Sequence, residues 1–258
     1  MNAIHQWSTS PLPKRAVFIS DLHLMSTRST AEQHHDRIGA LIERNEIAVW
    51  GGDLFDFRWS RFATESKAVD YSLAYLAQWR QQFPQQQFVF LCGNHDASPL
   101  FLNELREWIQ DDPHFVFAGD VLRIGDTVML HGDQIEGRGT IHRFESYRQR
   151  WADKKRAAMW RFAGYDAIVA ARAHKVAAAV AHRNKMAIKK LNRFLTLHDL
   201  THQAGVRQVV FGHTHRLIRG VQHNHIHFYN GGAAIRHVPF RPVEIELGDS
   251  EQATPKRG

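Results

Sequence analysis

Short apolar runs alternate with helical patterns along most of this 258-residue chain. Five runs rich in β-branched or aromatic side chains, as buried strands usually are, lie at residues 16–20, 47–50, 88–92, 128–130 and 209–211. Apolar positions at helical spacing cover residues 30–46, 66–83 and 98–110. Strands that alternate with helices indicate an α/β fold.

Hairpin spacing after Pro113 adds antiparallel pairing to this pattern. Strand-like runs at residues 115–117, 121–124 and 128–130 follow closely on one another, and Gly125-Asp126 predicts a tight turn. Two late runs, at residues 226–229 and 243–247, are expected to complete a second layer. The sequence therefore predicts an α/β (α+β) protein with two layers of mixed parallel and antiparallel strands.

The pattern changes to helix alone between residues 138 and 204. Phe144, Tyr147 and Trp151 lie three and four positions apart, as on one helix face. A similar apolar spacing continues, after a break at Gly164, through Val169, Ala173, Val176, Val180, Ile188, Leu191 and Leu195. We expect a helical lid at residues 138–204, inserted into a single domain that spans residues 1–258.

Charge is concentrated in this insert. The net charge of the chain is +7, but residues 138–193 hold fifteen Lys or Arg against three acids, so this segment carries +12 and the rest −5. Such a concentration points to an anionic partner, which could be a phosphorylated substrate, an anionic membrane surface or nucleic acid. The alternative is an ordinary solvated helix face.

Cysteine content and hydropathy bear on location. Cys92 is the only cysteine, which excludes an internal disulfide and suits a reducing compartment. No apolar segment approaches secretory or membrane-spanning length. We therefore expect a cytoplasmic protein, or one that lies peripherally on the cytoplasmic face of the inner membrane.

Each of the five strand-like runs is followed directly by a polar motif. Ligands at the ends of buried strands are held on rigid elements around one cleft. Together the motifs offer enough oxygen and imidazole ligands for two metal ions. They are Asp21-Leu22-His23, Gly52-Asp53-Leu54-Phe55-Asp56, Gly93-Asn94-His95-Asp96, His131-Gly132-Asp133 and Gly212-His213-Thr214-His215.

The ligand types narrow the choice of metal. Carboxylate, amide and imidazole groups without a thiolate suit Mn²⁺, Fe²⁺ or Zn²⁺, and of these three we expect Mn²⁺. Alternate residues of an extended segment point to one face, so Asp21 and His23 are expected to share one ion. The same geometry would make His213 and His215 co-facial, where they could serve two adjacent ions.

The five motifs, in identity and order, resemble those of the calcineurin-like metallophosphoesterases. The resemblance implies a two-sheet β-sandwich of mixed strands flanked by helices, with a helical lid inserted before the last metal-binding motif. It implies that a hydroxide shared by two ions attacks phosphorus in line. It also implies two ligand sets that share Asp53, namely Asp21, His23, Asp53 and His215 for one ion, and Asp53, Asn94, His131 and His213 for the other.

His95 follows a ligand directly, and in this family that histidine contacts the phosphate or protonates the leaving oxygen. The resemblance therefore implies catalytic and substrate-binding roles for His95. Asp96 is expected to hydrogen-bond the imidazole and to orient it, and helix capping or a salt bridge is an equal alternative. Asp56 and Asp133 are expected to organise their loops through backbone N–H bonds.

Among these enzymes, the chain resembles the bacterial UDP-2,3-diacylglucosamine pyrophosphatases of lipid A biosynthesis, through Ile19-Ser20-Asp21-Leu22-His23-Leu24 and a basic insert before Gly212-His213-Thr214-His215-Arg216. This implies cleavage of a nucleotide-sugar lipid to UMP and a sugar-lipid phosphate. The apolar stripe would receive acyl chains, or it only packs the insert onto the core. The expected phosphate or headgroup contacts are Arg143, Arg148, Arg150, Lys154 and Lys155.

One position differs from that subfamily. Its members usually carry Gly-Asn-Arg-Asp, whereas this chain has His95 in the third place, as general phosphoesterases do. The alternative function is a general phosphomonoesterase or a cyclic-nucleotide phosphodiesterase. A nuclease and a metal-bearing binding scaffold without catalysis are less favoured, so nucleic acid is not the expected partner.

Overall fold

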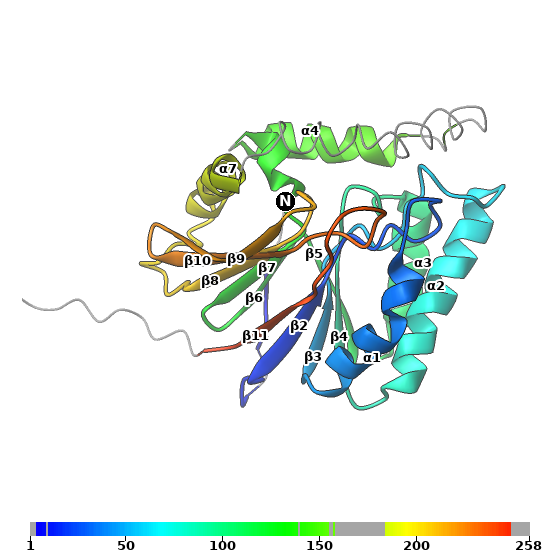
Figure 1. Cartoon of the computed structure of the whole chain (residues 1–258), viewed down its shortest axis with the longest axis horizontal. Helices are drawn as coiled ribbons and strands as arrows, with labels where there is room; N and C mark the ends of the chain where they lie inside the picture. Colours follow the sequence, from blue (N-terminus) through cyan, green and yellow to red (C-terminus); the bar gives the residue numbers. More distant parts are fainter. Residues whose placement is uncertain (1–3, 9, 139, 155–156, 158–183, 249–258) are drawn as a thin grey trace, which may run out of the picture.

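The computed structural model describes residues 4–8, 10–138, 140–154, 157 and 184–248. The predicted break at Gly164 and the stripe positions Val169, Ala173, Val176 and Val180 lie outside these residues, as does Lys155. Two β-sheets make up the centre of the described part, and helices cover their outer faces (Figure 1). The predicted fold class, two mixed sheets flanked by helices, is confirmed.

The first sheet has five strands in the order β11-β2-β3-β4-β5. Strands β2 to β5 are parallel, and β11 runs antiparallel to β2. Its strands are β2 (Arg15–Ile19), β3 (Ile47–Trp50), β4 (Gln87–Leu91), β5 (Phe115–Gly119) and β11 (Val243–Glu246).

The second sheet has six strands in the order β1-β6-β7-β8-β10-β9. Strands β6 and β7 form the predicted hairpin, and β7, β8 and β10 are parallel neighbours. Its strands are β1 (Ile4–Gln6), β6 (Val121–Ile124), β7 (Thr127–Leu130), β8 (Gln208–Phe211), β9 (Leu217–His223) and β10 (Ile226–Gly231).

The central strands are apolar on both faces because each face is buried. In β2, Val17 and Ile19 pack toward the helices, whereas Ala16 and Phe18 pack between the two sheets. This two-sided burial explains why these strands read as continuous apolar runs rather than as an alternation. A third apolar cluster lies between the second sheet and the helix α7 (Asn184–Leu197).

The predicted helices form with small shifts at their ends. Residues 30–46 fold as the 3-10 helix η1 (Ala31–His34) and α1 (His35–Glu43). Helix α2 (Glu65–Gln82) begins after Thr64, which accepts a hydrogen bond from Lys67 N, and α3 (Pro99–Ile109) is capped by Ser98, which accepts one from Phe101 N. These three α-helices cover the outer face of the five-stranded sheet (Figure 1).

The insert supplies α4 (Ile141–Ala152) and α7, and a short 3-10 helix η2 (Asp133–Gly137) leads into α4. Helix α4 lies across one end of the two sheets, and α7 lies beside the six-stranded sheet (Figure 1). Among the described residues, no helix is long and apolar enough to cross a membrane.

One prediction about the late strands is wrong. They do not complete one second layer together, because β10 joins the six-stranded sheet and β11 forms the edge of the other. The sequence analysis also omitted β1 and β9. Strand β1 has only three residues, and β9 is largely exposed and contains Gly220, so neither forms an apolar run.

Candidate metal centre

The five polar motifs meet at one end of the two sheets. Three follow the parallel neighbours β2, β3 and β4, and two follow the parallel neighbours β7 and β8. Backbone hydrogen bonds join the loops, since Asp21 N donates to the Gly52 carbonyl and Gly212 N donates to the His131 carbonyl. The motif loops therefore present their side chains to a common site.

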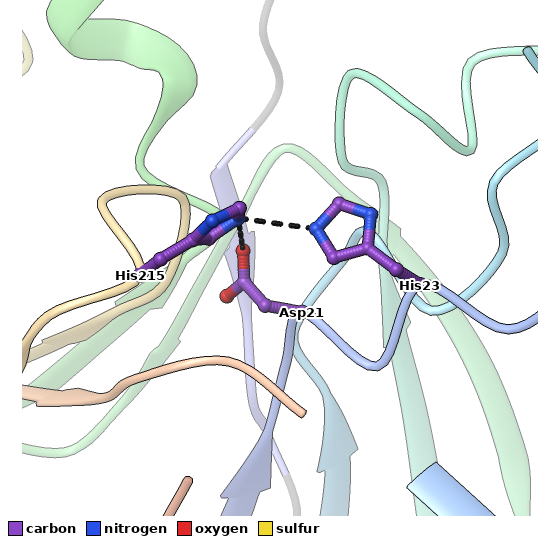
Figure 2. Close-up of side chains that lie close together, drawn as sticks. All are labelled: Asp21, His23 and His215. Carbon is purple, nitrogen blue, oxygen red and sulfur yellow. Dashed lines mark hydrogen bonds and ion pairs between the residues drawn. The ribbon is translucent and has the colours of Figure 1, made fainter. Parts of the chain in front are cut away.

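A first cluster of ligand-type side chains joins the loops after β2 and β8 (Figure 2). His215 Nε2 lies 3.2 Å from Asp21 Oδ1 and 3.1 Å from His23 Nε2. Atoms at this spacing can share one ion at ~2.1 Å from each. Asp21 and His23 are buried and His215 is partly exposed, so this cluster is accessible from one side.

A second cluster consists of Asp53, His131 and His213. His131 Nε2 lies 3.4 Å from Asp53 Oδ2, and His131 Nδ1 donates to the Gly51 carbonyl at 3.0 Å. This hydrogen bond fixes the ring and directs Nε2 at the cluster, since a metal-binding histidine commonly donates its other ring N–H to a backbone carbonyl. His213 N donates to both carboxylate oxygens of Asp21, so the two clusters are adjacent.

Two buried polar atoms of the site have no hydrogen-bond partner among the described residues, namely Asn94 Oδ1 and His131 Nε2. Leaving such an atom buried and unpaired costs about 1–3 kcal/mol, and a bound cation would remove this cost. The donor set is carboxylate, amide and imidazole, while the Cys92 thiol is directed at the Gly93 carbonyl instead. The residues present therefore fit a pair of divalent ions.

Electrostatics at the second cluster agree with this fit. Burial lowers the pKa of His131, but the carboxylates of Asp53 and Asp21 outweigh burial and raise it to about 10. Burial likewise opposes ionisation of Asp53, yet His131 and His95 hold its pKa well below the usual range. In the metal-free protein a proton on His131 thus balances Asp53, and a divalent cation can replace that proton.

The ligands are not placed by strand alternation, which corrects one prediction. Strand β2 ends at Ile19, and the residues Asp21 and His23 have φ angles of 57° and 47°, in the left-handed region rather than the extended one. His213 and His215 have φ angles of 63° and 54° and belong to different clusters. Left-handed backbone at non-glycine residues costs of order 1–3 kcal/mol each and is concentrated at functional sites.

Two motif glycines are required by close approach. A Cβ atom at Gly93 would lie 2.3 Å from both the backbone nitrogen and Oδ1 of Asp53. At Gly212 it would lie 2.3 Å from Asp21 Oδ2. Any side chain at these positions would displace a ligand carboxylate, so the glycines allow the loops to pack against the metal ligands.

The partner of His95 is Asp56. His95 Nδ1 lies 2.8 Å from Asp56 Oδ1, and Asp56 also contacts His23 and Arg28. Burial lowers the pKa of His95, but the carboxylates of Asp56 and Asp53 reverse the effect and raise it. Burial opposes ionisation of Asp56 itself, yet His95 holds the pKa of that carboxyl well below its usual range. The pair therefore favours a protonated His95.

The expected hydrogen bond between the His95 imidazole and the Asp96 carboxylate does not form, so this prediction is wrong. Asp96 turns into the protein, where it accepts hydrogen bonds from Phe55 N at 2.9 Å and from Gly93 N at 3.2 Å. Burial and the charge of Asp53 raise the pKa of Asp96 to about 7. Asp96 thus holds together the loops after β3 and β4. Asp56 also organises its own loop as expected, because it accepts a hydrogen bond from Trp59 N at 3.1 Å.

The basic residues of α4 lie in different environments. Arg148 forms a two-pronged ion pair with Asp133, with both distances 2.8 Å, and contacts Asp120 at 3.2 Å, so it binds α4 to the core. Arg143 and Arg150 are exposed on α4. Lys154 is exposed at its end and lines a cavity.

This cavity of about 340 Å³ lies next to Asn94 and His95. Phe57, Ala97 and Trp151 contribute apolar surface, and Arg58 and Lys154 contribute positive charge. The Trp151 ring centroid is 4.4 Å from that of His95, so α4 reaches the site directly. The sequence analysis missed Arg58 and the pairing of Asp56 with His95. It also missed Glu136, whose Oε1 lies 3.5 Å from His213 Nε2.

A mixed two-sheet fold that carries carboxylate, amide and imidazole ligands on five strand-end loops defines a metal-dependent hydrolase. Comparison with known families agrees, because a family model described as calcineurin-like phosphoesterase matches residues 14–217. The chain belongs to the calcineurin-like phosphoesterase family. It is thus a metal-dependent hydrolase of phosphoesters with a dinuclear site for divalent cations.

Further comparisons add little beyond the family. No curated protein matches the chain. Among solved structures, a dimetal phosphatase from Danio rerio is similar, with 14% sequence identity and a TM-score of 0.49, and the match covers 92% of this chain and 93% of that one.

Proposed function

We propose that this protein uses two Mn²⁺ ions to hydrolyse the pyrophosphate bond of a nucleotide-sugar lipid such as UDP-2,3-diacylglucosamine, giving UMP and a sugar-lipid phosphate. The observation that carries this choice is the cavity beside His95, which combines apolar walls from Phe57 and Trp151 with the charges of Arg58 and Lys154. A small phosphomonoester needs no such apolar and cationic extension of the site.

The two clusters divide the ligands between two ions. When bound, the ions would supply an acidified water molecule and neutralise charge on the phosphoryl oxygens. Asp53 would be common to both sites, because its Oδ2 faces His131 while its Oδ1 accepts a hydrogen bond from His95 N at 2.8 Å. The first ion would be held by Asp21, His23, Asp53 and His215, and the second by Asp53, Asn94, His131 and His213.

His95 would supply the proton that the leaving group needs. A water molecule gives one proton to the solvent as its oxygen forms a bond to phosphorus. The bond from phosphorus to the leaving oxygen breaks, that oxygen takes a proton from His95 Nε2, and His95 then regains a proton from the solvent. Asp56 holds Nδ1 at 2.8 Å, so Nε2 is the ring nitrogen left for the substrate. The raised pKa of His95 favours retention of this proton.

The lipid part of the proposed substrate implies a cellular location for the protein. We propose that it acts in the cytoplasm, at the surface of an anionic inner membrane from which the lipid is taken. Exposed cations on α4, among them Arg143 and Arg150, support this contact.

Release of UMP from UDP-2,3-diacylglucosamine in vesicles tests the proposal. Protein loaded with Mn²⁺ should release UMP, and Asp53→Asn should abolish the release. Hydrolysis of nitrophenyl phosphates or cyclic nucleotides without any release of UMP would reject the lipid substrate. It would favour a general phosphomonoesterase or a cyclic-nucleotide phosphodiesterase, the candidate that the Gly93-Asn94-His95-Asp96 motif supports.

A further inference from the structure

We propose that Arg58 and Lys154 form a binding site for a second phosphate group, carried by the leaving part of the substrate. This inference rests on the proposed function, since it assumes that His95 faces the leaving oxygen. It adds two specificity-determining residues that lie outside the five metal-binding motifs.

The position of the cavity is the first observation. Its lining includes Asn94 and His95 on one side and Arg58 and Lys154 on another. A leaving group that departs past His95 therefore enters a space of about 340 Å³ that already contains two cations. That volume exceeds the ~30 Å³ of one water molecule many times over, so it can hold a phosphate group.

Both cations are held against Trp151. Lys154 Nζ lies 3.5 Å from the centroid of the Trp151 ring, and Arg58 Cζ lies 5.7 Å from it. The Arg58 carbonyl accepts a hydrogen bond from Ala157 N at 2.8 Å, which ties its loop to the chain just beyond α4. Ring contacts and this hydrogen bond thus bring the two charges, from distant parts of the sequence, to one aromatic surface.

The two cations of the cavity are not paired with its two acids. Among the described residues, Arg58 and Lys154 form no ion pair with a carboxylate. The two acids that line the cavity accept from neutral groups instead, because Glu65 accepts from Ser98 Oγ at 2.6 Å and Asp153 accepts from Gln149 Nε2 at 2.9 Å. The acids keep their negative charge, but the donor groups of Arg58 and Lys154 are left for a bound phosphate.

Repulsion between the two cations also favours the binding of an anion. Burial lowers the pKa of the Lys154 amine, and the neighbouring charges of Arg58 and Arg150 lower it further. A bound phosphate would relieve this repulsion and would accept charge-assisted hydrogen bonds from both side chains. Arginine and lysine next to an aromatic ring suit a phosphate better than a neutral sugar or an alkyl chain.

Two substrate classes carry a second phosphate, and they can be distinguished by turnover. UDP-glucose is a pyrophosphate diester, adenosine 3′,5′-bisphosphate bears its second phosphate on the ribose, and bis(p-nitrophenyl) phosphate has none. In the Mn²⁺-loaded protein, Arg58→Gln and Lys154→Gln should each lower kcat/KM about 10- to 100-fold for the substrate that carries the second phosphate, whether this is UDP-glucose or adenosine 3′,5′-bisphosphate. Turnover of bis(p-nitrophenyl) phosphate should stay within about twofold. Arg61→Gln, an exposed neighbour that packs on Phe62, serves as the control and should change neither rate.

A binding measurement separates this inference from the proposed function. Mn²⁺-loaded protein is titrated in a calorimeter with methylenediphosphonate and with methylphosphonate. Tighter binding of the diphosphonate, weakened about 10-fold or more by Arg58→Gln, supports the site even if no substrate is turned over. Equal binding of the two probes, or equal loss of turnover on all three substrates in Arg58→Gln, overturns it. If no substrate at all is hydrolysed with metal, the proposed function fails and the binding result decides the inference alone.

Discussion

At the scale of single residues, the reactivity of the site depends on a pair of side chains from neighbouring loops. Asp56 follows β3 and His95 follows β4, and their 2.8 Å contact lies at the edge of the first metal cluster. Asp56 also lies 3.5 Å from His23 Nδ1. One buried carboxylate therefore contacts both a histidine of the first metal cluster and the histidine for which we propose contact with the substrate.

Replacing Asp56 tests this arrangement through the pH dependence of turnover. Asp56 and Asp53 raise the pKa of His95, so Asp56→Asn should lower that pKa. A group that must be protonated loses its activity as the pH rises through its pKa, so the alkaline limb should move to lower pH. We expect kcat to fall about 10- to 100-fold. The measurement is kcat against pH, with metal content determined on the same samples.

The matched control is Asp70→Asn, which removes an exposed carboxylate from α2 and should leave the profile unchanged. An alkaline limb that stays in place in Asp56→Asn would show that His95 is not the titrating acid.

At the scale of elements, α4 is attached to the core in part through Arg148, most of whose side chain is buried. Arg148 is only 14% exposed, and its partner Asp133 is fully buried. Arg148 also donates to the Cys92 carbonyl at 3.1 Å, two residues before the ligand Asn94. The helix that carries Trp151 is therefore joined to the loops of two metal-binding motifs.

Breaking this attachment should destabilise the protein strongly. Arg148→Ala leaves the Asp133 carboxylate buried without its partner, which typically costs about 3–5 kcal/mol. Arg150→Ala, on the exposed side of the same helix, should change the free energy of unfolding by no more than about 0.5 kcal/mol. Urea unfolding of both variants measures the difference. Equal effects of the two substitutions would mean that Arg148 does not anchor α4.

The sequence predicted those elements whose burial is continuous. The parallel strands and α2 and α3 follow from apolar runs and caps such as Ser98, which are local features. Strand β9, which is mostly exposed, and the choice of sheet for β10 and β11 depend on pairing partners far along the chain. Such partners leave no mark in a local pattern.

The same limit applied to the metal site, where local features could be predicted from the sequence and contacts between distant residues could not. Motif spacing placed the ligands on adjacent loops, but the sequence favoured Asp96, the direct neighbour of His95, as its partner. The true partner, Asp56, lies 39 residues away in the sequence and approaches only through the fold. The left-handed backbone at Asp21 and His23 was also missed, because the sequence favoured simple alternation. Arg58 was missed because it lies outside every motif, and only its approach to Trp151 marks it.

At the scale of the whole molecule, the metal site connects the two sheets. Asp21 and Asp53 follow strands of one sheet, and His131, His213 and His215 follow strands of the other. Ions bound between these residues would hold the sandwich together at this end. Folding stability and metal binding are therefore expected to be linked.

Metal addition should accordingly raise the free energy of unfolding. At a Mn²⁺ concentration of about 100 times Kd, binding of one ion to the folded state adds about 2.7 kcal/mol. Urea unfolding with and without Mn²⁺ measures this gain, and Asp53→Asn should lose most of it. Unfolding curves that coincide with and without the ion would contradict the link.

The most direct test of the account is the number of metal ions that one chain retains. Protein reconstituted with Mn²⁺, freed of loose ions and analysed by mass spectrometry of the metal should hold two ions per chain, whereas Asp53→Asn should hold at most one. Anomalous scattering from crystals of the loaded protein should place the two ions between the ligand clusters on either side of Asp53. Retention of a single ion by the unaltered protein, or of two by Asp53→Asn, would contradict a dinuclear centre that shares this carboxylate.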